Sequence, residues 1–332
     1  MLTGRKLKEE KWLPPSNEII SFRNVDKVYK SGHTTNYALD SINFSIKTGK
    51  TLSVVGESGS GKTTFGLASL GLIEPTRGKI YFQGIDITSL DRIQKRNFRS
   101  KTHMIFQDPY SSLNPYNNIF TTVSAPIESF QKGMSKEERR NKAAEMLDKV
   151  GLSPGADFLD IYPKSLSGGQ RQRVAIARSL INKPEFVVAD EPTSMLDVSI
   201  TSTVINLMKS LKDELNFTML YISHEIATSR YIGDDMAVMN LGRIVEYGSP
   251  EEITKSPKHP YTDLLIRSYP KPGQKLVPGE TRHGDYNVYN GGIKGCTFAY
   301  ACPFKIPECE NTKPELREIS QGHWVACFHP IN

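Results

Sequence analysis

The sequence predicts an α/β protein with a mostly parallel sheet, and two observations lead to this prediction. Apolar runs at residues 51–56, 186–190 and 217–223 have the length and the β-branched content of strands buried on both faces. Helical patterns, at residues 65–72 and 199–215, follow the first two of these runs. Strands that alternate with helices indicate parallel strands in one sheet, with helices covering both of its faces.

The remaining elements support this class in chain order. Residues 19–29 and 37–46 are rich in β-branched and aromatic residues and flank a loop, which predicts an N-terminal antiparallel β-subdomain. Further strands are expected at 79–87 and 101–107, and the segment 236–248 reads as a hairpin-like pair of strands.

Two changes of composition divide the chain. Residues 108–165 are first rich in Ser, Asn and Pro and then show a helical pattern, which predicts an inserted α-helical subdomain. Beyond residue 256 the composition shifts to Pro and Gly. We therefore expect a main domain at 16–255 and a C-terminal extension at 256–332.

The charge and hydropathy of the chain exclude several classes of function. A net charge of +6 over 332 residues, with basic and acidic residues intermingled, favours a solvated surface over a nucleic-acid interface. The N-terminal segment is too charged for a signal peptide. No apolar run approaches the roughly 18 residues needed to span a bilayer. These features predict a soluble, cytoplasmic protein that works at a membrane only through partners.

A phosphate-binding loop follows the first apolar strand. Residues 56–63 read GESGSGKT and fit G-x-x-x-x-G-K-[ST], between a strand and a helix as this motif requires. Glycines let successive N–H groups point at one anion, and the helix N-terminus adds its dipole. In this interpretation Lys62 neutralises the β- and γ-phosphates and Thr63 ligates Mg²⁺, whereas an ordinary Gly/Ser turn is the alternative. The candidate phosphate-site residues are Gly56, Ser58, Gly59, Ser60, Gly61, Lys62, Thr63 and Thr64.

Two acidic residues end the apolar strand at 186–190. Because ligands of open α/β sheets gather at the carboxyl ends of the strands, Asp190 and Glu191 are expected to face the phosphates. Asp190 is predicted in the Mg²⁺ shell, and Glu191 is predicted to polarise the water that attacks the γ-phosphate. The sequence thus indicates an ATPase.

The segment LSGGQ at 166–170 identifies the kind of ATPase. With the phosphate loop and the Asp190 strand, it resembles the nucleotide-binding subunits of ABC transporters, which implies a RecA-like P-loop NTPase core. A helix is expected to begin here, with free backbone N–H groups at its N-terminus that form a second anion site. The residues concerned are Ser167, Gly168, Gly169 and Gln170. The resemblance implies that this signature caps the γ-phosphate of ATP held by a second subunit, identical or paralogous, in a head-to-tail dimer.

Further positions match this family one by one. The resemblance implies that Tyr29 stacks on adenine, although a sheet-packing role is the alternative. It also implies that Gln107 reaches Mg²⁺ and the attacking water, that His224 contacts the γ-phosphate, and that Asp197 lies in the dimer-contact loop. The predicted catalytic residues are therefore Glu191, His224 and Gln107.

The C-terminal extension narrows the family. Its segment from Lys258 to Tyr261 and its cysteine-containing tail resemble the extensions of ATPase subunits from oligopeptide and dipeptide importers, a family that includes nickel and oligosaccharide importers. The resemblance implies two membrane permease subunits, an extracellular substrate-binding protein acting indirectly, and a place at the cytoplasmic face of the membrane. Import of an oligosaccharide or nickel is the alternative. A soluble ABC ATPase that acts on ribosomes or nucleic acid is less favoured, because the chain has one set of motifs and no coiled-coil insertion.

All four cysteines of the chain lie in this tail. They are Cys296, Cys302, Cys309 and Cys327. Disulfides are disfavoured in a reducing compartment, and four thiolates can hold a [4Fe–4S] cluster or tetrahedral Zn²⁺. The spacing lacks the tight pairs of zinc sites, and some members of the resembled family carry a cluster. A structural, metal-stapled tail with a [4Fe–4S] cluster is therefore our prediction, and Zn²⁺ or no metal are the alternatives.

Overall fold

The computed structural model describes residues 17–32, 34–131, 133–268 and 293–331. Residue 16, the predicted start of the main domain, lies outside the described residues. So do residues 269–292 and 332 of the predicted extension.

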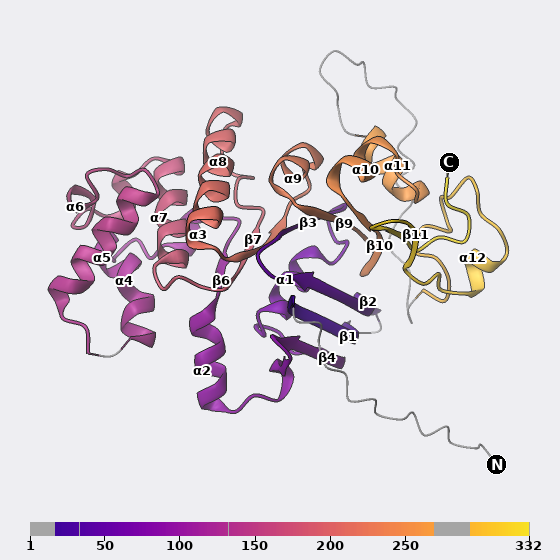
Figure 1. The fold of residues 1–332 in the computed structure, drawn as a ribbon, viewed down its shortest axis with the longest axis horizontal. Helices are drawn as coiled ribbons and strands as arrows, with labels where there is room; N and C mark the ends of the chain where they lie inside the picture. Colours follow the sequence, from indigo (N-terminus) through magenta and orange to yellow (C-terminus); the bar gives the residue numbers. More distant parts are fainter. Residues whose placement is uncertain (1–16, 33, 132, 269–292, 332) are drawn as a thin grey trace.

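The described chain forms an α/β protein with two sheets (Figure 1). The strands are β1 (Glu18–Ser31), β2 (Thr34–Lys47), β3 (Thr51–Val55), β4 (Arg77–Phe82), β5 (Ile85–Asp86), β6 (Thr102–Ile105), β7 (Phe186–Asp190), β8 (Thr218–Ile222), β9 (Asp235–Asn240), β10 (Arg243–Gly248), β11 (Arg317–Ser320) and β12 (His323–Val325). The α-helices are α1 (Lys62–Ser69), α2 (Arg92–Lys101), α3 (Pro109–Ser112), α4 (Ile119–Phe130), α5 (Lys136–Lys149), α6 (Gly155–Phe158), α7 (Gly168–Leu180), α8 (Val198–Leu215), α9 (Ile226–Ile232), α10 (Pro250–Lys255), α11 (Pro260–Arg267) and α12 (Glu308–Asn311). Two short 3₁₀ turns, Ile87–Ser89 and Pro163–Ser165, complete the elements.

The larger sheet is mixed and has the strand order β11-β12-β10-β9-β3-β8-β7-β6. Its parallel half runs from β9 to β6, and β10, β12 and β11 continue it with antiparallel pairs. Strands β3, β7 and β8 are buried along their whole length, as their continuous apolar sequences predict. The sheet is thus less parallel than the sequence predicted, since the C-terminal strands extend it.

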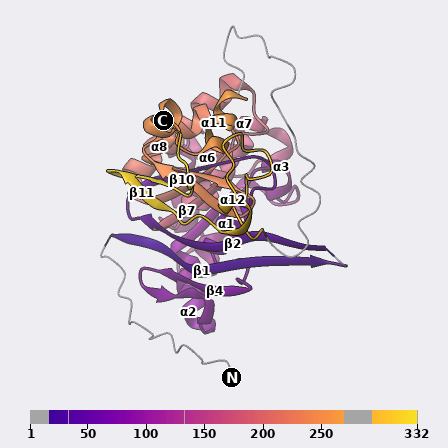
Figure 2. The same ribbon diagram turned by 90° about the vertical axis from the view of Figure 1, so that its right-hand side faces the viewer.

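The smaller sheet is antiparallel, with the order β2-β1-β4-β5, as predicted for the N-terminal part of the chain. It forms a layer beside the larger sheet, with β1 and β2 running beneath β7 and β10 in Figure 2. Helix α1 lies between the two layers, and its Phe65 ring stacks on Phe22 with 4.4 Å between the centroids. This packing holds the start of α1 in place beneath the end of β3.

The helices α3 to α7 form a group at one end of the molecule (Figure 1). Apolar side chains of α4 to α7 pack together with residues of α8 and of β6 to β8 in one buried cluster. Helix α5 begins with a capping box, in which Ser135 and Glu138 satisfy each other's backbone N–H groups. The helical segment predicted within residues 108–165 is therefore packed on the sheet edge at β6 and β7.

The C-terminal extension joins the main domain through the sheet and through a buried carboxylate. Strand β12 pairs with β10. Glu246 of β10 is fully buried, and its carboxylate accepts hydrogen bonds from the N–H groups of Lys258 and His259 at 2.7 and 2.9 Å. The same carboxylate lies 2.7 Å from Nε2 of His323. Each partner named here for the Glu246 side chain therefore comes from the extension.

Within the described part of the chain, no helix has both the length and the apolar character needed to cross a membrane.

Candidate functional site

The phosphate loop lies between β3 and α1, and its glycines adopt conformations that other residues disfavour. Gly56 and Gly61 have φ values of 156° and 103°. A Cβ atom on Gly61 would lie 2.3 Å from the carbonyl oxygen of Ala38, and one on Gly56 would lie 2.2 Å from that of Met239. Glycine is therefore required where the loop passes β2 and β9. Ser58 and Gly59 are exposed at the tip of the loop.

Lys62 carries a buried positive charge at the centre of this loop. Its side chain reaches back so that Nζ donates to the carbonyl oxygens of Gly56 and Glu57, both at 2.8 Å. Burial lowers the pKa of Lys62, although the carboxylates of Glu191, Asp190 and Glu57 act in the opposite direction. An ammonium group has three N–H donors, so Lys62 can keep a backbone carbonyl and still bind phosphate oxygens.

Asp190 and Thr63 provide the oxygen ligands expected for a divalent cation. The Thr63 hydroxyl donates to Oδ1 of Asp190 at 3.3 Å. Burial raises the pKa of Asp190, the Thr63 hydrogen bond opposes this, and the adjacent Glu191 carboxylate raises the pKa further. Hydroxyl and carboxylate oxygens are hard ligands, so this corner fits Mg²⁺.

The three predicted catalytic residues lie together at the ends of three neighbouring strands. Gln107 follows β6, Glu191 follows β7 and His224 follows β8. Nε2 of Gln107 donates to Oε2 of Glu191 at 3.0 Å, and Nδ1 of His224 lies 3.2 Å from Oε1 of Glu191. Glu191 has a φ of 44°, a left-handed conformation that is uncommon outside glycine. Its N–H group donates to the carbonyl of Ile222 at 2.8 Å, which holds the carboxylate at the sheet edge.

The signature residues lie at the start of α7, within the helical group in Figure 1. Ser167 and Gln170 form a capping box in which each side chain bonds the other's backbone N–H group. A Cβ atom on Gly169 would lie 2.9 Å from Cγ2 of Ile200, so the starts of α7 and α8 pack closely. Asp197, just before α8, is exposed and makes no side-chain cap.

Tyr29 lies near the end of β1 and remains 44% exposed. Nζ of Lys27 lies 5.1 Å from the centroid of its ring. The ring therefore remains accessible to a ligand over part of its surface.

The four cysteines line one small cavity together with His259. All four are free thiols, and burial raises the pKa of Cys296, of Cys302 and, to about 11, of Cys327. Among the residues that the structure describes, however, no three His, Cys, Asp or Glu side chains form a group able to hold a metal ion. The expected metal-stapled tail is therefore seen as a convergence of thiols, without a metal-binding group.

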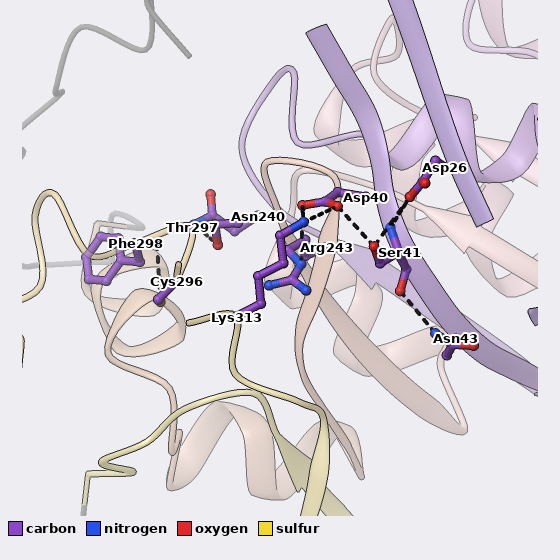
Figure 3. A network of polar contacts seen from close by, with 10 residues as sticks. All are labelled: Asp26, Asp40, Ser41, Asn43, Asn240, Arg243, Cys296, Thr297, Phe298 and Lys313. Carbon is purple, nitrogen blue, oxygen red and sulfur yellow. Dashed lines mark hydrogen bonds and ion pairs between the residues drawn. The ribbon is translucent and has the colours of Figure 1, made fainter. Parts of the chain in front are cut away.

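An ion network around the buried Asp40 joins the extension to β2 and β10, and no expectation from the sequence included it. Figure 3 shows the Asp40 carboxylate next to the side chains of Lys313 and Arg243. Nζ of Lys313 donates to its two oxygens at 2.6 and 2.8 Å, and Nε of Arg243 lies 3.5 Å from Oδ2. Asp40 is 4% exposed. No local pattern in the sequence pointed to these partners.

The sequence is similar to two described families. Residues 39–194 match the family described as "ABC transporter", and residues 245–309 match "Oligopeptide/dipeptide transporter, C-terminal region".

Individual relatives agree with these matches. The dipeptide transport ATP-binding protein DppF of Haemophilus influenzae is 42% identical over 88% of this chain and 89% of its own length. The oligopeptide transport ATP-binding protein AppF of Bacillus subtilis is 41% identical over 87% of this chain and 88% of its own. Among solved structures, the dimeric post-hydrolysis state of the ATP-binding cassette MJ0796, bound to ADP and Pi, superimposes with a TM-score of 0.64. It is 35% identical and covers 70% of this chain and 99% of its own.

Proposed function

The chain belongs to the ATP-binding subunits of ABC transporters, in the oligopeptide and dipeptide importer family, and from this premise we propose that it hydrolyses ATP to power peptide import. The observation that carries the proposal is the arrangement of Gln107, Glu191 and His224 at three strand ends beside the phosphate loop.

The phosphate loop binds the triphosphate in this proposal. Lys62 keeps its hydrogen bond to the carbonyl of Gly56, exchanges the carbonyl of Glu57 for phosphate oxygens and neutralises the β- and γ-phosphates, while loop N–H groups and the start of α1 bind the remaining oxygens. Thr63 and Asp190, with Gln107 nearby, hold Mg²⁺, which when bound neutralises charge on the β- and γ-phosphate oxygens. Tyr29 offers its open face to the adenine ring.

Glu191 is the proposed general base. Its carboxylate lies between Gln107 and His224, so a water beside it would lose a proton to Glu191 while the neighbouring groups fix the carboxylate's orientation. Gln107 orients the water, and His224 contacts the γ-phosphate. These roles place proton transfer and charge stabilisation on separate side chains.

A head-to-tail dimer completes the site. The amides at Ser167 to Gln170 open α7 and are directed, in this proposal, at the γ-phosphate held by a second ATPase subunit, identical or paralogous. Asp197 lies at the same dimer contact. The dimeric cassette with which this chain superimposes supports this arrangement. ATP binding closes the dimer, and hydrolysis reopens it.

The permeases dock, we propose, in a groove between the helical group and the sheet. The groove has a volume of about 560 Å³ and is lined by apolar and basic side chains, among them Phe106, Phe130 and Arg178. A groove of this kind fits the coupling helix of a membrane subunit. In this proposal the protein lies peripherally at the cytoplasmic face, with two permeases and indirectly an extracellular binding protein as partners.

The cysteines are proposed to hold a structural [4Fe–4S] cluster, with Zn²⁺ as the alternative. Support comes from the four thiols that line one cavity, and from their spacing, which lacks the tight pairs typical of zinc sites. A bound cluster supplies four bonds that tie the turns of the tail together. The test is to purify the protein without oxygen, record its visible spectrum and assay its iron, sulfide and zinc contents. These measurements decide between a cluster and Zn²⁺. A protein that contains neither metal contradicts the proposal.

Phosphate release by the purified protein tests the enzymatic function. We expect Mg²⁺-dependent hydrolysis of ATP that is lost in Lys62→Ala. If the wild-type protein neither binds nor hydrolyses ATP, alone or with its paralogous partner, the proposal is wrong.

A further inference from the structure

The C-terminal extension contacts the phosphate loop directly. Tyr261 of α11 is 1% exposed, and its hydroxyl oxygen accepts a hydrogen bond from the N–H group of Glu57 at 3.1 Å. These two residues are 204 positions apart in the sequence. The extension therefore reaches the loop that binds the triphosphate.

The hydrogen bond fixes one peptide plane of the loop. The Glu57 N–H group and the Gly56 carbonyl belong to the same planar peptide unit and point in opposite directions. The N–H group donates to Tyr261, while the carbonyl accepts from Nζ of Lys62 at 2.8 Å. As long as Tyr261 holds the N–H side, this carbonyl stays directed at the Lys62 ammonium group.

Packing and capping hold Tyr261 itself in place. Its ring packs edge-on against Phe298 with 5.6 Å between the centroids. Its N–H group donates to Nδ1 of His259, which caps α11, at 3.0 Å. Burial raises the pKa of Tyr261 well above the ordinary value, so the side chain stays a neutral hydroxyl. The hydroxyl is thus delivered to Glu57 by a rigid element.

Lys313 of the same extension is linked to the other side of the loop through Asp40, and Figure 3 shows its contact with the Asp40 carboxylate. It bonds Asp40, whose N–H group donates to the carbonyl of Gly242 at 3.0 Å. The N–H group of Gly242 donates in turn to the carbonyl of Ser60 in the phosphate loop at 2.8 Å. Two parts of the extension therefore contact or support the same loop, one at Glu57 and the other, through Asp40 and Gly242, at Ser60.

We propose that Tyr261 is a positioning residue for nucleotide binding, which sets the orientation of the Gly56–Glu57 peptide and through it the place of Lys62. The proposal rests on the assignment of residues 56–63 as the ATP site. It gives the extension a direct part in ATP affinity, beyond any metal that its cysteines hold.

Tyr261→Phe tests this proposal, because it removes the hydroxyl and keeps the ring. A neutral hydrogen bond of this kind contributes enough to change a binding constant about two- to tenfold when lost. We expect the dissociation constant and the KM for ATP to rise by that factor while kcat changes little. A merely structural loss would instead lower the amount of active enzyme and leave KM unchanged.

Tyr247→Phe is the matched control. Tyr247 lies in strand β10, and its hydroxyl forms a hydrogen bond with Lys47, away from the phosphate loop. We expect its KM for ATP to equal that of the wild type. Thermal unfolding of both variants shows whether they fold alike. If Tyr261→Phe is misfolded, Lys313→Met is the second variant, with a higher KM again expected.

An unchanged KM in a folded Tyr261→Phe variant overturns this inference and leaves the ATP site intact. A wild-type protein that binds no ATP refutes the proposed function instead, so the two failures are distinguishable.

Discussion

Replacing Lys313 with Met removes one of the two cations beside the buried Asp40 carboxylate. The methionine keeps most of the side-chain length, so the packing of the stem is largely retained. Lys313 donates two hydrogen bonds to Asp40, at 2.6 and 2.8 Å, whereas Arg243 stands further away at 3.5 Å. The variant therefore leaves the buried carboxylate with the more distant Arg243 and with the neutral Ser41 hydroxyl, which donates to Oδ1 at 3.2 Å.

The size of the expected loss of stability depends on how deeply Asp40 and Lys313 are buried. Hydrogen bonds to charged groups contribute about 1.5–3 kcal/mol. The Asp40 side chain is 5% exposed but that of Lys313 is 35% exposed, so solvent screens part of the interaction. We expect the free energy of unfolding to fall by about 2 kcal/mol, which lowers the Tm by roughly 3 °C in a chain of this size.

A double-mutant cycle with Asp40→Asn isolates the pair. Asp40→Asn leaves Lys313 and Arg243 as neighbouring cations, so we expect the double variant to lose less than the sum of the single losses. Lys305→Met is the control within the same extension, because Lys305 pairs with Glu310 at the surface, where both side chains are largely exposed. It should change stability by less than about 0.5 kcal/mol.

Denaturant titration followed by fluorescence, with thermal scans in parallel, measures these differences. If Lys313→Met costs no more than Lys305→Met, and the cycle shows no coupling, Arg243 alone balances Asp40 and the reasoning is refuted.

Three further predictions concern the active site, the groove and the cysteines. Glu191→Gln should slow phosphate release at least about 100-fold yet keep an ATP-dependent dimer in size-exclusion chromatography; turnover near that of the wild type removes Glu191 as the base. Burial, with Arg178 nearby, lowers the pKa of His103 from 6.5 to about 4, so the unfolded chain binds a proton first and stability falls as the pH drops below 6.5. His103→Leu should remove about 2 kcal/mol of the loss between pH 7 and pH 5 in denaturant titrations, and an identical pH dependence contradicts this. Cys302→Ser should lower both the Tm and the metal content of protein purified without oxygen; unchanged values argue against a structural cluster.

The elements that the sequence predicted well are those with a local signal. The phosphate loop has fixed spacing, and β3, β7 and β8 are continuous apolar runs, so both were found where the structure has them. Helix α2 (Arg92–Lys101) was missed, although Asp91 just before it and Gln94 in its first turn stand at capping-box spacing. That signal could have found the helix.

The contacts that were missed are long-range. Asp40 and Lys313 are 273 positions apart, and neither shows a periodicity or motif that links it to the other. Strands β11 and β12 are short, of four and three residues, within a Pro-rich tail that shows no alternation of polar and apolar residues. Their place in the sheet depends on tertiary pairing with β10, which propensity does not encode.

The buried Glu246 carboxylate has a consequence for biosynthesis. Its three named partners are the N–H groups of Lys258 and His259 and the ring of His323, all downstream of β10. On a ribosome, β10 emerges with a carboxylate that must stay hydrated, since burying it without partners is costly. The edge of the sheet therefore reaches its final form only after His323 has left the exit tunnel, well after β10 itself has emerged.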